Sequence, residues 1–150
     1  MKYKAMIILL FACFSFLTGC DPNKYIDVSD QQKFKTIINS EFIILVDLEV
    51  IGVSFDANYK KNVDYVYLVK KPGISGPEVV FKNSLNKGTK IKIIGVFVSD
   101  SLFAKEHYYR VEIVGSNQFN SYVVLIYDSG DVDSQNFGLD EAIFKRIKPS

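Results

Sequence analysis

The stretch TKIKIIGVFV, residues 89–98, carries the clearest secondary-structure signal in this chain of 150 residues. Within it, Lys90 and Lys92 alternate with Ile91 and Ile93. Strict alternation of polar and apolar residues is the period of a β-strand that has one face in a core and the other in water. We therefore predict a strand over 89–98 whose Ile91 and Ile93 side chains face the core.

Further β signals lie on both sides of this stretch. Segments rich in β-branched and aromatic residues predict strands when turn residues bound them. They are 42–53, 63–69, 78–81, 107–114 and 121–127. The loop KKPGISGP, at 70–77, and the turn Asn86-Lys87-Gly88 separate some of them. Short strands at this spacing predict a mainly β fold, either a small antiparallel β-barrel or a sandwich.

Two segments favour short helices at the ends of this β pattern. Segment 31–39 (QQKFKTIIN) has Phe34, Ile37 and Ile38 at helical spacing, and it is either a short helix or the first strand. We favour the helix. Segment 139–147 (LDEAIFKRI) has acids at its start and bases near its end, which suits the helix macrodipole. It predicts a short C-terminal helix.

The first twenty residues have the parts of an export signal. Lys2 and Lys4 form a basic start, and an almost unbroken apolar run follows over 5–17. This run is shorter than the ~20 residues that a membrane span needs. Leu17-Thr18-Gly19-Cys20 comes directly after it. These four residues resemble a lipobox, the recognition motif of bacterial prolipoproteins.

The lipobox resemblance implies lipidation of Cys20, cleavage after Gly19 and acylation of the new amino group. A cysteine is required because its thiolate is the nucleophile that takes the lipid. Residues 1–19 are then a signal peptide, 20–32 the lipidated N-terminus and a polar tether, and 33–150 a single β-rich domain. The chain is expected in the bacterial cell envelope, with the membrane as its first partner. Asp21 resembles the enterobacterial signal for retention in the inner membrane; other bacteria use other signals, so the choice of membrane stays open.

Composition excludes several classes of function. The chain has two cysteines, Cys13 and Cys20; the first is lost with the signal peptide and the second carries lipid, so neither a disulfide nor thiol redox chemistry is expected. The net charge is +1, which provides no basic field for nucleic acid. No cofactor motif is present in the sequence.

Residues 85–93 (LNKGTKIKI) place a lysine–glycine turn before a strand, and Tyr108-Tyr109-Arg110-Val111 form an aromatic-x-x-Val pattern in another strand. With these features, segment 66–125 weakly resembles a bacterial Src-homology-3-like domain. That family usually has Trp where Tyr108 or Tyr109 stands, and an N-V-R start that this chain lacks. The resemblance implies a five- or six-stranded barrel that binds cell-wall peptide or another protein.

Few residues carry catalytic or metal-binding chemistry. His107 is the only histidine, so it cannot form the usual zinc site, and no nucleophile accompanies it; we expect an ordinary surface or edge residue. Asp128, Asp131 and Asp133 lie in an acidic loop, but the spacing fails the calcium-loop pattern, with Asn136 where glycine belongs. We expect no metal.

Tyrosines are the candidate binding residues. The set is Tyr59, Tyr65, Tyr67, Tyr108, Tyr109 and Tyr122, and the binding face that we predict from it consists of Tyr65, Tyr67, Tyr108 and Tyr109. Strand aromatics also serve as core and cross-strand partners, so a purely structural role stays open.

Three functions from different classes fit these features. The first, which we favour, is a non-enzymatic envelope lipoprotein whose β-domain binds a partner protein or a cell-wall component such as peptidoglycan. The second is a periplasmic inhibitor or immunity protein that blocks a toxin or a lysozyme. The third is an enzyme, for which Glu106 with Glu112, or Asp131 with Asp133, are the only candidate acid–base pairs.

Overall fold

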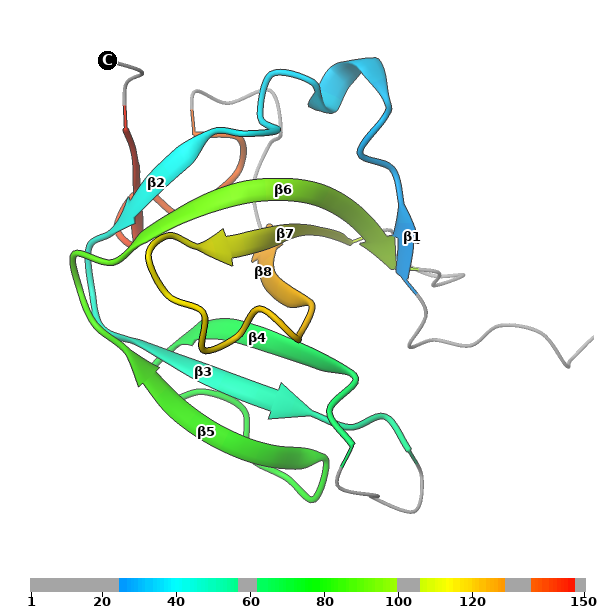
Figure 1. Cartoon of the computed structure of the whole chain (residues 1–150), viewed down its shortest axis with the longest axis vertical. Coiled ribbons are helices and arrows are strands. Elements are labelled where there is room, and N and C mark those ends of the chain that lie inside the picture. Colours follow the sequence, from blue (N-terminus) through cyan, green and yellow to red (C-terminus); the bar gives the residue numbers. More distant parts are fainter. Residues whose placement is uncertain (1–24, 57–61, 100–105, 129–135, 148–150) are drawn as a thin grey trace, which may run out of the picture.

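The computed structural model describes residues 25–56, 62–99, 106–128 and 136–147 (Figure 1). Within these ranges the chain forms one sheet of nine strands, so the prediction of a mainly β fold is confirmed. The strands are β1 (Tyr25–Asp27), β2 (Glu41–Ile44), β3 (Leu48–Val53), β4 (Tyr65–Lys70), β5 (Val79–Leu85), β6 (Lys90–Ser99), β7 (His107–Ile113), β8 (Val124–Asp128) and β9 (Phe144–Arg146). A 3-10 helix, η1, spans Gln32–Phe34.

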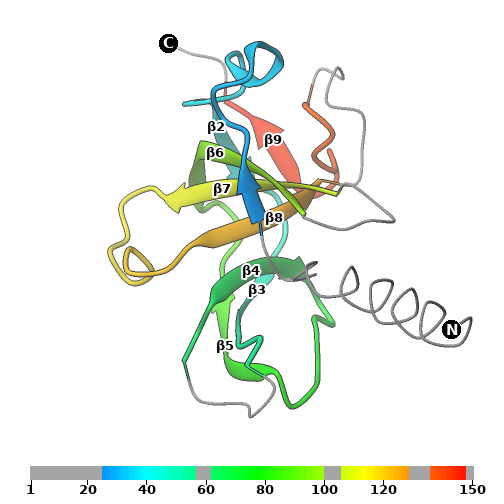
Figure 2. The same cartoon turned by 90° about the vertical axis from the view of Figure 1, so that its right-hand side faces the viewer.

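The sheet closes on itself through one bent strand. Along the sheet it is β5-β3-β4-β8-β7-β6-β2-β9, with β1 on β6 (Figure 2). β2 and β3 are successive parts of one bent strand, and β5 and β6 flank one turn. The backbone N–H of Ile44 donates to the Thr89 carbonyl at 2.9 Å, and that of Gly88 to the Ile44 carbonyl at 2.8 Å. Pairing therefore continues through the bend, and the sheet closes as a barrel does.

The prediction that all strand pairs are antiparallel is wrong at one pair. β4 and β8 are parallel, with Val66 opposite Val124 and Tyr67 opposite Leu125. β8 follows β7 in an antiparallel hairpin and then meets a strand from much earlier in the chain. A partner so distant in sequence leaves no local pattern, because alternation shows only which face of a strand is buried.

The strand predicted over 89–98 is β6, with the faces as expected. Ile91 and Ile93 are fully buried, whereas Lys90 is exposed. Ile93 pairs with Val111 and Gly95 with Arg110, so Ile94 is an extra residue, a β-bulge. The bulge reverses the alternation beyond it and leaves Ile94 38% exposed.

The predicted C-terminal helix is wrong. Turns precede Phe144, and residues 144–146 form β9, which pairs with β2. The Asp140 carboxylate accepts a hydrogen bond from the Ala142 N–H at 2.8 Å, which favours a turn over a continuing helix. Phe144 is buried in the core, and a segment so short is determined by its packing more than by helix propensity.

Three other predicted boundaries change at the N-terminal side. The single strand predicted over 42–53 is divided into β2 and β3 by a bend at 45–47. Segment 31–39 holds only one turn of 3-10 helix followed by turns, and it ends at Asn39 with a φ of 69°. Residues 25–27, predicted to belong to the tether, form β1 and pair with the end of β6.

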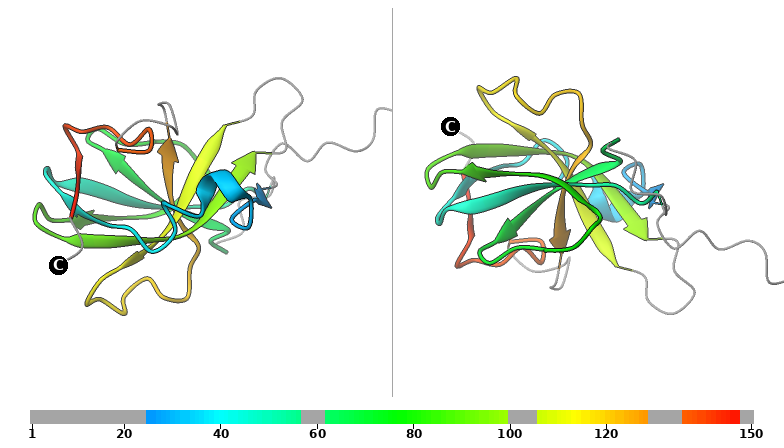
Figure 3. Two further views of the ribbon diagram at one scale, coloured as in Figure 1. Left: turned by 90° about the horizontal axis from the view of Figure 1, so that it is seen from above. Right: turned by 90° about the horizontal axis from the view of Figure 1, so that it is seen from below.

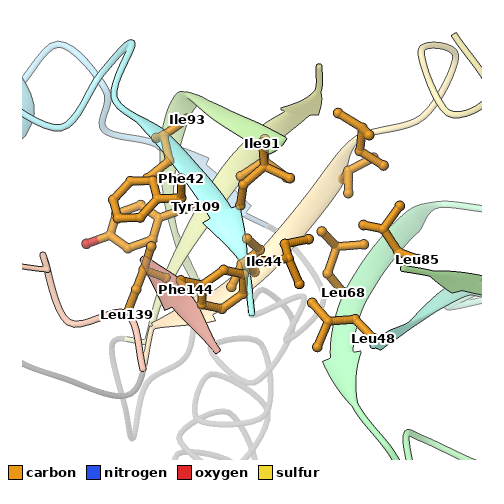
Figure 4. Close-up of a cluster of buried hydrophobic side chains, with 14 of the residues drawn as sticks. Phe42, Ile44, Leu48, Leu68, Leu85, Ile91, Ile93, Tyr109, Leu139 and Phe144 are labelled. Carbon is orange, nitrogen blue, oxygen red and sulfur yellow. The ribbon is translucent and has the colours of Figure 1, made fainter. Parts of the chain in front are cut away.

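The main core lies on one face of the closed sheet (Figure 4). Strand residues of alternating position meet there with side chains from the terminal segments; Figure 4 labels Phe42, Ile44, Leu48, Leu68, Leu85, Ile91, Ile93, Tyr109, Leu139 and Phe144. Tyr109 is fully buried, and its hydroxyl donates to the Phe137 carbonyl at 2.6 Å. The core therefore ties the C-terminal segment to β7.

A glycine in β3 makes room for an aromatic ring from β5. Gly52 lies opposite Phe81, and a Cβ added to Gly52 would overlap the Phe81 ring. The ring cannot move freely, because it stacks on Phe119 and contacts Tyr122, with centroids 6.5 and 5.9 Å away. We expect Gly52→Val to lower the free energy of unfolding by about 1–3 kcal/mol, measured by urea denaturation.

The same substitution in a Phe81→Ala background provides the control. Removing the ring opens the space above Gly52, so the cost of Gly52→Val should fall to a small fraction of its value in the native chain. Two equal costs would show that the ring is not what the new side chain displaces.

Candidate functional site

Three of the four tyrosines predicted to form a binding face meet on the side of the sheet opposite the main core. Tyr67 alternates with the core residues Val66 and Leu68, and Tyr108 precedes the core residue Tyr109. A second, smaller group of buried residues forms there from Ile51, Val53, Tyr67 and Leu125, with partly buried aromatic residues around it.

Tyr25 of β1 is at the centre of these tyrosines. Its ring meets those of Tyr65 and Tyr108 edge-on, with centroids 4.8 and 4.9 Å away. Its hydroxyl lies 2.7 Å from the hydroxyl of Tyr67. Tyr127 joins the group through a ring contact of 5.5 Å with Tyr108. We call Tyr25, Tyr65, Tyr67, Tyr108 and Tyr127 the tyrosine cluster.

Within the tyrosine cluster, burial and hydrogen bonding raise the pKa of two hydroxyl groups, those of Tyr67 and Tyr108. Burial, followed by the hydrogen bond to Tyr25, raises the pKa of Tyr67 far above its usual value. Burial, followed by the 2.8 Å bond to the Glu106 carboxylate, raises the pKa of Tyr108 in the same way. Neither hydroxyl can become a phenolate at neutral pH, so what these two groups offer is packing and hydrogen bonding.

The remaining tyrosines of the predicted set lie elsewhere. Tyr109 is on the core side of β7, so the face predicted from Tyr65, Tyr67, Tyr108 and Tyr109 lacks that member. Tyr122 is 37% exposed in the segment that links β7 to β8. Tyr59 lies outside the described residues. Sequence analysis missed Tyr25 and Tyr127 as members of the cluster.

A groove of about 240 Å³ lies beside β7, next to the segment that links it to β8. Its lining combines apolar, charged and amide side chains, including Ile94, Arg110, Glu112, Phe119, Asn120 and Tyr122. The position of each part of this lining can be traced to a nearby feature of the sheet. The bulge turns Ile94 outward, and the stacking of Phe119 on Phe81 holds the linking segment in place.

Two side chains of opposite charge, Arg110 and Glu112, line this groove. Arg110 and Glu112 are two residues apart on β7, so both side chains leave the same face of the strand. Within the described residues, neither side chain has a hydrogen bond or a close ion pair, although Lys92 of β6 lies opposite Glu112 in the register and on the same face. Arg110 is half-buried and Glu112 is exposed. The groove thus presents a positive and a negative side chain to a ligand, with Lys92 beside the carboxylate.

Among the described residues, the predicted catalytic candidates do not assemble into a site. Glu106 and Glu112 lie at opposite ends of β7, roughly 20 Å apart at the rise of a strand, which exceeds the carboxyl separation of glycosidases. His107 begins β7, and its ring lies 5.7 Å from that of Phe34. Asp128 ends β8, whereas Asp131 and Asp133 lie outside the described residues.

Two further findings concern metals and membranes. Among the residues that the structure describes, no three His, Cys, Asp or Glu side chains gather in a way that could hold a metal ion. In the same ranges, none of the helical segments is long and apolar enough to cross a bilayer.

Comparison of the chain with protein-family models, with curated proteins and with solved structures returned no match. What the protein does is therefore inferred from its own residues and their geometry.

Proposed function

We propose that this protein is a bacterial envelope lipoprotein, anchored to a membrane through Cys20, whose β-domain binds a partner protein or a cell-wall component and catalyses no reaction. The export signal and the lipobox-like Leu17-Thr18-Gly19-Cys20 support the location. The groove beside β7 supports the binding, and the opposite charges of Arg110 and Glu112 in its lining are the observation that carries this part of the proposal.

The chemistry of the groove favours a peptide as ligand. The Arg110 guanidinium can donate two parallel hydrogen bonds to a carboxylate, and the Glu112 carboxylate can accept bonds from an ammonium group. Their positions two residues apart on one face place their Cα atoms about 7 Å apart along β7. Both a protein segment and the peptide of a cell wall carry carboxylates and amines, whereas a neutral glycan carries no charge to pair with Arg110 or Glu112.

Apolar contacts complete the recognition surface. Ile94 and Tyr122, on the groove's lining, are 38% and 37% exposed. Interfaces usually combine such an apolar or aromatic anchor with polar groups around it. The groove therefore offers a short peptide both charge complementarity and a surface on which to bury a side chain.

Reversing either charge tests this function. We expect Arg110→Glu and Glu112→Lys each to weaken binding to purified peptidoglycan, or to an envelope protein crosslinked to the native chain in cells, by at least tenfold. A tenfold loss corresponds to about 1.4 kcal/mol, which is within the cost of breaking one charged contact. Cosedimentation with peptidoglycan and crosslinking yield are the measurements.

Lys35→Glu is the matched control, because Lys35 is an exposed residue beyond η1 and lies outside the groove. It should leave binding unchanged. All three variants should stay folded and melt cooperatively, since none of the three side chains belongs to either hydrophobic core. Undiminished binding by both groove variants would contradict the proposed site.

A further inference from the structure

The position of β1 limits how far the domain can stand from the lipid. Tyr25 is five residues after Cys20. A fully extended chain covers at most about 3.6 Å per residue, so Tyr25 lies within about 18 Å of Cys20. This step rests on the proposed lipidation of Cys20, which places that residue at the bilayer surface.

β1 does not lengthen the connection between Cys20 and the domain, because β1 is itself paired within the sheet. Tyr25, Ile26 and Asp27 pair with residues 97–99 of β6, and the Val28 N–H donates to the Val96 carbonyl at 2.9 Å. The Tyr25 side chain is further fixed by Tyr65, Tyr67 and Tyr108. The end of the barrel that carries β1 therefore stays close to the membrane, within the length of the segment that joins Cys20 to Tyr25.

The most exposed large apolar side chains of the described residues lie at this end. Tyr127 is 49% exposed and Ile26 is 48% exposed. Ile26 is part of β1. The Tyr127 ring contacts the ring of Tyr108, which in turn contacts the ring of Tyr25. Tyrosine is enriched at the surface of bilayers, where its ring meets apolar lipid and its hydroxyl stays in water.

We infer that the β1 end of the barrel, with Ile26 and Tyr127, rests on the phospholipid headgroup layer of the membrane to which the chain is anchored. The partner is the bilayer surface itself, chosen over a protein because the short connection to Cys20 brings it within reach. β1 pairs with the end of β6, which pairs in turn with the start of β7 (Figure 3). The groove is lined by later residues of β7 and by the segment after it. This placement directs the groove away from the bilayer.

Tryptophan fluorescence can test the contact, because the chain has no tryptophan of its own. The lipidated protein is purified from bacterial membranes and reconstituted in phosphatidylcholine vesicles, with or without brominated acyl chains that quench nearby tryptophan. Ile26→Trp and Tyr127→Trp each place one reporter at the β1 end. Tyr122→Trp, at another exposed tyrosine, places one in the groove.

We expect brominated lipid to quench Ile26→Trp and Tyr127→Trp at least twice as strongly as Tyr122→Trp, with emission shifted to shorter wavelength. Equal, weak quenching of all three in protein that carries the acyl mass and floats with vesicles would overturn the membrane contact and leave the lipidation intact. Protection of the two reporters from aqueous iodide without quenching by brominated lipid would indicate a second copy of the chain on this face, and would also overturn the membrane contact. Protein without acyl mass would overturn both proposals.

Discussion

Replacing Tyr109 with alanine is expected to lower the free energy of unfolding by about 3–5 kcal/mol, the usual cost of removing a large aromatic side chain from a core. The Tyr109 ring is fully buried in the main core. Its hydroxyl also satisfies the Phe137 carbonyl at 2.6 Å, so truncation leaves both a cavity and an unpaired acceptor. A loss of this size is a large part of the stability of an ordinary domain.

Two variants separate the contributions to this loss. Tyr109→Phe keeps the packing and removes only the hydrogen bond, so it should cost about 1 kcal/mol. Tyr108→Ala removes the half-buried neighbouring ring on the opposite face and should cost less than Tyr109→Ala. Urea denaturation gives all three values. A larger loss for Tyr108→Ala would mean that the two faces of β7 have been assigned the wrong way round.

Local alternation is what made part of this fold predictable from sequence. The buried face of β6 follows from Lys90, Ile91, Lys92 and Ile93, because side chains on a strand point alternately to its two sides. The bulge at Ile94 was not predictable, since a bulge depends on how the partner strand pairs. The parallel pairing of β4 with β8 was not predictable either, because it depends on a partner strand distant in the sequence.

The residues of the groove and of the tyrosine cluster also divide into those that local alternation predicts and those that depend on tertiary pairing. Arg110 and Glu112 alternate with the buried Val111 and Ile113, so a shared outer face could be predicted for them from sequence. Their approach to Ile94 and to the linking segment depends on tertiary pairing. The contribution of Tyr25 to the tyrosine cluster was missed because β1 has only three residues and follows a polar stretch, so no local period reveals it.

Replacing Cys20 with alanine is expected to abolish lipidation completely. Alanine has no thiol to take the diacylglyceryl group, and without that group the cleavage after Gly19 should also fail. The product should be a full-length precursor that retains residues 1–19 and carries no acyl chain. Metabolic labelling with palmitate followed by intact-mass measurement tests both consequences.

Cys13→Ala is the matched control, because Cys13 is the other cysteine of the chain and lies inside the apolar run of the export signal. This variant should be labelled and cleaved as the native chain is.

Each buried methylene of an acyl chain contributes about 0.8 kcal/mol to membrane binding, so losing two or three chains removes tens of kilocalories per mole of gross anchoring energy. The label and the mass decide the question better than fractionation does, because an uncleaved apolar run can itself hold a precursor on the membrane. Palmitate label on the Cys20→Ala chain would show that the anchor lies elsewhere, and the inferred contact of Ile26 and Tyr127 with the bilayer would then lose its basis.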